Sequence, residues 1–114
     1  MKAAEATTAA AAENAARLTN ASRVAVARSL ASRMRGLMLR RDLPRGEALL
    51  IERCPAIHTF FMRFPIDALF LDGAGNPVRL VRDIAPWRAW VCGGKKARAV
   101  LEARAGWLEV REPV

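Results

Sequence analysis

Residues 66–83 read IDALFLDGAGNPVRLVRD, and this stretch decides the fold class. In 66–72, the side chains Ile, Ala and Phe fall on one face of an extended chain and Asp, Leu and Leu on the other, because successive residues of a strand alternate. The Gly- and Pro-containing run at 72–77 is typical of a hairpin connection, and residues 78–83 return as a second strand. The stretch therefore predicts a β-hairpin.

Short apolar runs flank this hairpin. We expect further extended segments at 23–27, 48–52, 59–63, 99–103 and 107–110. Leu30, Met34, Leu37 and Met38 recur at helical spacing after Ser29, a residue type that caps helix N-termini. The prediction is a mainly β (α+β) domain, with a small barrel-like or sandwiched antiparallel sheet of about six or seven short strands and one amphipathic helix.

The composition fits one folded domain. The chain has 114 residues, of which 53% are hydrophobic, so it can bury one core but not two. Residues 1–21 are rich in Ala, and we expect a disordered tail or fraying helix there, followed by a single β-rich domain at 22–114. The sequence contains no run of about 18 apolar residues, so it predicts no membrane-spanning helix. Without a recognisable leader, the sequence predicts a cytoplasmic protein, or an exported one if a leader was removed.

Chemically versatile residues are densest at 54–67, which reads CPAIHTFFMRFPID and contains the chain's one histidine. Polar and aromatic groups gathered where a strand begins are typical of a binding site. We expect a binding or accessory domain whose partner is a small ligand or a protein, acting as a monomer. The expected ligand-binding residues are His58, Thr59, Met62, Arg63, Asp67 and Trp87. The alternative is structural: a buried thiol, a histidine held by the backbone, and Asp67 in an ion pair.

Two other readings of this segment stay open. Cys54 and His58 could form the nucleophile and base of a thiol hydrolase or transferase, although no orienting residue lies close in sequence, so the prediction leans away from an enzyme. Cys54, His58, Asp67 and Cys92 lack the paired spacing of a zinc site. No metal and no cofactor is therefore expected.

A basic group accompanies the expected helix. The formal net charge is +8, and six arginines between Arg28 and Arg45 face the single Asp42. Such a group binds phosphates readily, so the expected anion-binding residues are Arg33, Arg35, Arg40 and Arg41. No nucleic-acid recognition motif accompanies them, which leaves nucleic acid, another anion or a merely solvated surface as alternatives.

Three segments, RGLM at 35–38, residues 54–72 and VLEARAG at 100–106, resemble the prokaryotic domain of unknown function 192 family (DUF192) over about residues 23–106. The resemblance implies a small β-barrel-like domain with one packed helix, often monomeric, with no established activity. Family members often carry an export leader and a Gly-Asp pair near the end; this sequence shows neither, which puts the last strand in doubt. The positions that match the family pattern are Gly36, Leu37, Met38, His58, Met62, Asp67, Glu102 and Gly106.

Overall fold

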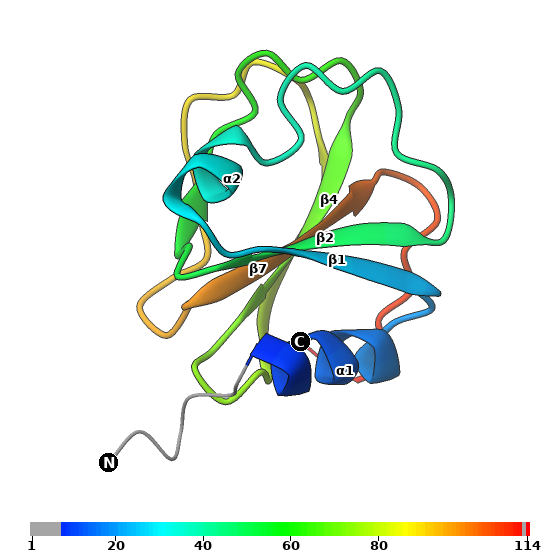
Figure 1. The fold of residues 1–114 in the computed structure, drawn as a ribbon, viewed down its shortest axis with the longest axis vertical. Coiled ribbons are helices and arrows are strands. Elements are labelled where there is room, and N and C mark those ends of the chain that lie inside the picture. Colours follow the sequence, from blue (N-terminus) through cyan, green and yellow to red (C-terminus); the bar gives the residue numbers. More distant parts are fainter. Residues whose placement is uncertain (1–7, 113) are drawn as a thin grey trace.

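The computed structural model describes residues 8–112 and 114, which form two helices and seven strands (Figure 1). The helices are α1 (Thr8–Leu18) and α2 (Leu30–Arg35). The strands are β1 (Arg23–Ala27), β2 (Glu47–Glu52), β3 (Ala56–Ile57), β4 (Ile66–Leu71), β5 (Pro77–Ile84), β6 (Val91–Cys92) and β7 (Ala99–Arg104). The mainly β class predicted from the sequence is confirmed.

Five strands form one mixed sheet in the order β1-β2-β7-β4-β5, and β3 pairs with β6 in a separate small sheet. The predicted hairpin is confirmed as β4 and β5, which pair antiparallel. In its turn, the Asp72 carboxylate accepts the backbone N–H groups of Ala74 and Asn76. β1 and β2 are parallel, so the sheet is not wholly antiparallel as expected. The reason is that α2 and the following turns carry the chain back before β2 begins.

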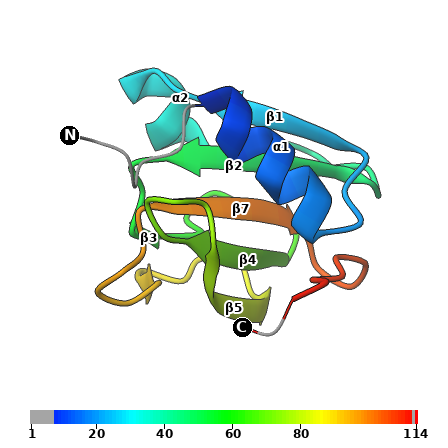
Figure 2. The same ribbon diagram turned by 90° about the horizontal axis from the view of Figure 1, so that it is seen from below.

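The sheet is covered on both faces. Figure 2 shows α1 lying across one of them, over β1 and β2. α1 and the C-terminal residues Trp107 and Leu108 pack on one face. Residues 37–43 and the β3–β6 region pack on the other. Every residue of β4 is consequently buried, whichever face of the sheet its side chain occupies.

The N-terminal segment, for which we expected a disordered tail or a fraying helix, is helical over much of its length. From Thr8 it forms α1, whose Ala15 belongs to one core cluster with residues of the sheet and whose Leu18 is buried. Because alanine side chains are short, the helix can approach the strands closely. Residues 1–7 of the expected tail lie outside the described residues.

Two other local expectations also differ. Ser29 caps α2 as predicted, accepting the Ser32 N–H at 3.0 Å, but the helix ends at Arg35. Leu37 is therefore buried from the turn after the helix, whereas Met34 is exposed. The aromatic segment at 59–63 forms turns, and 107–110 contributes only a single bridge from Val110 to Thr19. None of the described helices has the length and hydropathy needed to cross a membrane.

Candidate functional site

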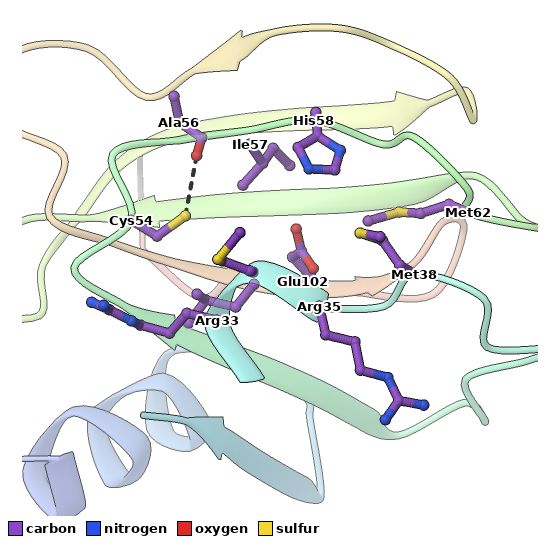
Figure 3. A pocket seen from close by; sticks show the side chains of 12 residues that line it. Arg33, Arg35, Met38, Cys54, Ala56, Ile57, His58, Met62 and Glu102 are labelled. Atoms are coloured by element: carbon purple, nitrogen blue, oxygen red, sulfur yellow. Dashed lines mark hydrogen bonds between the residues drawn. The ribbon is translucent and has the colours of Figure 1, made fainter. Parts of the chain in front are cut away.

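A cavity of about 310 Å³ lies between α2, the end of β2, the β3 region and the central strand β7 (Figure 3). Residues 33–38 from α2 and the turn after it form one wall, and residues 51–62 contribute another. The lining is rich in sulfur, since three of the four methionines and one of the two cysteines contribute to it. These residues are Met34, Met38, Met62 and Cys54.

Glu102 projects into this cavity from β7. Its neighbours across the sheet are Leu49 on β2 and Ala68 on β4, both buried and apolar. Oε1 of Glu102 has no hydrogen-bond partner among the residues that the structure describes. Burial raises the pKa of this carboxyl from its ordinary value of 4.5 to about 8. At neutral pH, Glu102 is therefore a protonated acid that can both donate and accept a hydrogen bond.

Gly36 brings the backbone over the carboxyl. Its φ of +49° ends α2 in a left-handed turn, where a side chain would be strained. A Cβ added there would lie 3.6 Å from Oε1 of Glu102 and 3.5 Å from Ile51. This segment therefore covers the acid closely without placing a side chain over it.

Arginines flank the same cavity. Arg33 is half-buried and its Nε has no hydrogen-bond partner in the described part of the chain. Arg35 is exposed and extends away from Glu102 (Figure 3). A second hollow of about 330 Å³ lies between α2 and β1 and is lined by Arg35 and Arg40. Arg41 is exposed and lines neither this hollow nor the cavity. The cavity thus combines an apolar, sulfur-rich lining with a buried acid and a cationic side.

Cys54 and His58 both line the cavity but have separate hydrogen-bond partners. The Cys54 thiol donates to the Ala56 carbonyl at 3.1 Å (Figure 3). Burial raises the pKa of this thiol, and the negative charge that the nearby Glu102 acquires when it ionises raises it further. Nδ1 of His58 accepts the Phe60 N–H at 3.1 Å, so the neutral ring carries its proton on Nε2. This arrangement favours a neutral thiol over an activated nucleophile.

Asp67 lies on the opposite face of the sheet from Glu102. The register pairs Ala68 with Glu102, so the preceding residue, Asp67, points to the other side. Its carboxylate is 1% exposed, lies 3.1 Å from the Arg82 guanidinium and accepts the Asp83 N–H at 2.9 Å. These partners give Asp67 a structural role.

The other expected ligand residues are divided between the cavity, the packing and the surface. Thr59 is buried and donates from its hydroxyl to the Ala85 carbonyl at 2.7 Å, while accepting the Arg88 N–H at 2.8 Å. Arg63 and Trp87 are exposed and do not line the cavity. Of the six expected ligand residues, the cavity brings together His58 and Met62.

The expected site did not include Glu102, the residue with the most perturbed chemistry. One signal was present, since 99–104 reads AVLEAR and places a single acid directly between apolar residues of an expected strand. An acid in that setting must be paired or protonated when the strand is buried on both faces. Within the described residues, no group of three or more His, Cys, Asp or Glu side chains is arranged to hold a metal ion.

Comparisons with known proteins give the family and the fold. The sequence model of the domain of unknown function 192 family, described as uncharacterized ACR, matches residues 10–112, which include most of α1. No curated protein matches the chain.

Two crystal structures share the fold. One, a protein of unknown function from Novosphingobium aromaticivorans DSM 12444, has a TM-score of 0.66 and 23% identity, over 73% of this chain and 63% of that one. The present chain thus spans less than two thirds of that protein's length. The other, from Sinorhizobium meliloti 1021 and provisionally described as a transcription regulator, has a TM-score of 0.67 and 23% identity, over 76% and 80% of the two chains.

Proposed function

The chain belongs to the domain of unknown function 192 family, and on that premise we propose that it is a binding domain for a small, mostly apolar organic molecule carrying a carbonyl or carboxylate group. One observation carries the proposal: a buried Glu102 carboxyl, one oxygen of which has no partner among the described residues, projects into a methionine-lined cavity. Buried polar atoms in folded proteins are nearly always paired, so an unpaired one beside a cavity indicates a place for a ligand's polar group.

The lining supports a ligand that is compact and largely apolar. A volume of about 310 Å³ is at the small end of the range for ligand pockets. Methionine side chains are flexible and polarizable, so the three at this cavity can adapt to an irregular apolar shape. Because the acid lies beyond them on β7, a ligand would bury its apolar part as it reached the carboxyl.

The charges favour a neutral or anionic polar group over a cationic one. A protonated Glu102 can donate its hydrogen to a carbonyl or share it with a carboxylate. Arg33 and Arg35 line the same cavity, and their charges repel an ammonium group while attracting a carboxylate. The Nε–H of Arg33, which has no partner in the part of the chain that the structure describes, adds a second donor on this side.

The test uses two probes of matched shape and opposite charge, hexanoate and hexylammonium, titrated into ¹⁵N-labelled protein and followed by amide chemical shifts. We expect hexanoate to shift the amides of residues 36, 54–58 and 102, and hexylammonium to bind at least tenfold more weakly. The variant Glu102→Leu should abolish the hexanoate shifts, whereas Glu109→Leu, at an exposed position, should leave them unchanged. Preferential binding of hexylammonium, or shifts confined to other parts of the chain, would contradict the proposal.

A further inference from the structure

An exposed apolar cluster is formed by Leu39, Phe61 and Trp87, which come from three separate segments. Their exposed fractions are 60%, 49% and 58%. The backbone N–H of Leu39 donates to the Phe61 carbonyl at 2.9 Å, and the rings of Phe61 and Trp87 lie 4.7 Å apart between centroids. The Trp87 N–H in turn donates to the Thr59 carbonyl at 2.8 Å. The three side chains therefore belong to one surface, which we call the LFW cluster.

The backbone holds each of these residues in a conformation that costs free energy. Leu39, Phe61 and Trp87 have φ values of +64°, +63° and +68°. Only five non-glycine residues of the described chain have positive φ, and only six large apolar side chains there are exposed; these three belong to both sets. Glycine or asparagine adopts such a backbone conformation at a lower free-energy cost. The large apolar side chains at these positions are exposed, so packing in the core does not explain their presence. Strain kept at exposed apolar positions indicates that the side chains serve binding.

The charge around the cluster identifies the kind of partner. Residues 33–41, 59–63 and 85–90, which carry the cluster, contain six arginines and no Asp or Glu. Those next to the cluster in sequence are exposed: Arg40, Arg41, Arg63 and Arg88. An apolar cluster that is flanked in sequence by exposed cations is complementary to a surface that is apolar inside and anionic outside.

We propose that the LFW cluster docks on an anionic lipid surface, with its apolar side chains inserted at the headgroup boundary and the neighbouring arginines on lipid phosphates. The ring planes support a lipid partner over single-stranded nucleic acid. Trp87 is tilted by 58° to Phe61 and by 50° to Phe60, so the rings form no flat stacking platform, and Leu39 has no ring at all. Tryptophan beside aliphatic residues and arginines is characteristic of the membrane interface.

This surface is independent of the ligand proposed for the cavity, although the two share backbone. Met38 and Met62 line the cavity, while the adjacent residues Leu39 and Phe61 are exposed. A protein docked through the cluster would therefore hold the cavity beside the lipid surface. Failure of vesicle binding would overturn the docking proposal and leave the cavity proposal untouched.

The test is co-flotation of the full chain with vesicles of phosphatidylcholine containing 30% phosphatidylglycerol, compared with pure phosphatidylcholine. We expect binding to the anionic vesicles that weakens at high salt, and at least tenfold weaker binding to the neutral ones. Leu39→Asn combined with Phe61→Asn should weaken binding to the anionic vesicles at least tenfold. Asparagine tolerates the positive φ at these positions, but its polar side chain does not insert into lipid. Val114→Ser removes an exposed apolar residue outside the cluster and should leave binding unchanged.

Thermal unfolding of each variant establishes that it is folded, and Trp87→Phe, which keeps a ring at this position, provides a milder second variant. The proposal is overturned if the chain binds neither vesicle or if the asparagine variant binds as the wild type does. It is also overturned if the cluster variants leave vesicle binding intact while abolishing binding to a single-stranded oligonucleotide or self-association.

Discussion

Replacing Glu102 by glutamine should remove the part of the pH dependence of stability that comes from titration of this carboxyl. The carboxyl titrates at about 8 when folded and near 4.5 when unfolded, so the folded state holds the proton more tightly. The resulting stabilisation is complete below pH 4.5 and is lost as pH rises toward and through 8, where the buried acid must ionise. At about 1.4 kcal/mol per pH unit, it falls by about 3 to 4 kcal/mol between pH 5 and pH 8.

The measurement is urea unfolding at pH 5, 6, 7 and 8 for wild type and Glu102→Gln, followed by tryptophan fluorescence. Glutamine keeps the size of the side chain and cannot ionise. The free energy of unfolding of the variant, relative to wild type, should therefore rise by about 3 to 4 kcal/mol across this range. Glu109→Gln removes a carboxyl from an exposed position and should follow wild type at every pH. A constant difference between Glu102→Gln and wild type would refute the buried, protonated acid.

Three further experiments test other parts of the structure. Asp67→Ala removes the acceptor of the Asp83 N–H and the partner of the half-exposed Arg82, and should lower the free energy of unfolding by about 2 kcal/mol. Asp42→Ala breaks an ion pair with Arg104 in which both side chains are exposed, and should lower the free energy of unfolding by less than about 1 kcal/mol. Equal losses of stability in Asp67→Ala and Asp42→Ala would contradict the structural role of Asp67. Gly93→Ala would place a Cβ 2.4 Å from the Phe70 ring and should cost about 1–3 kcal/mol in urea unfolding; wild-type stability would show that the packing there is looser. In the folded protein, iodoacetamide should modify the exposed Cys92 at least about tenfold faster than Cys54. Mass spectrometry of the variants Cys54→Ser and Cys92→Ser at pH 8 measures the two rates separately. Equal rates would be inconsistent with the raised pKa of the Cys54 thiol.

Local patterns in the chain were sufficient for the elements that depend on neighbouring residues. The β4–β5 hairpin was predictable because alternation and turn residues lie within one short stretch, and Ser29 was recognisable as a cap because it accepts the N–H of a residue three positions on. The same reasoning failed at 59–63, where aromatic residues suggested a strand and the chain instead turns through the left-handed conformation of Phe61.

The candidate site was only partly predictable, for reasons seen at its carboxylates. Asp67 attracted attention because it lies in a dense segment, but its partner is Arg82 on β5 rather than a residue close in sequence. Glu102 acquires its raised pKa from burial between β2 and β4, with Gly36 closing over it. Neither environment exists until the strands are assembled.

By itself, the sequence determined the β-rich class, the hairpin and the helix start at Ser29, whereas ligand binding by His58 and Met62 stays a prediction. Only the tertiary structure decided that Thr8–Leu18 packs on the sheet, that Asp67 and Glu102 occupy opposite faces, and that Leu39, Phe61 and Trp87 share one surface. The physical reason is that turn and strand preferences act over a few residues. Burial, pairing and pKa depend on which distant segments cover a side chain.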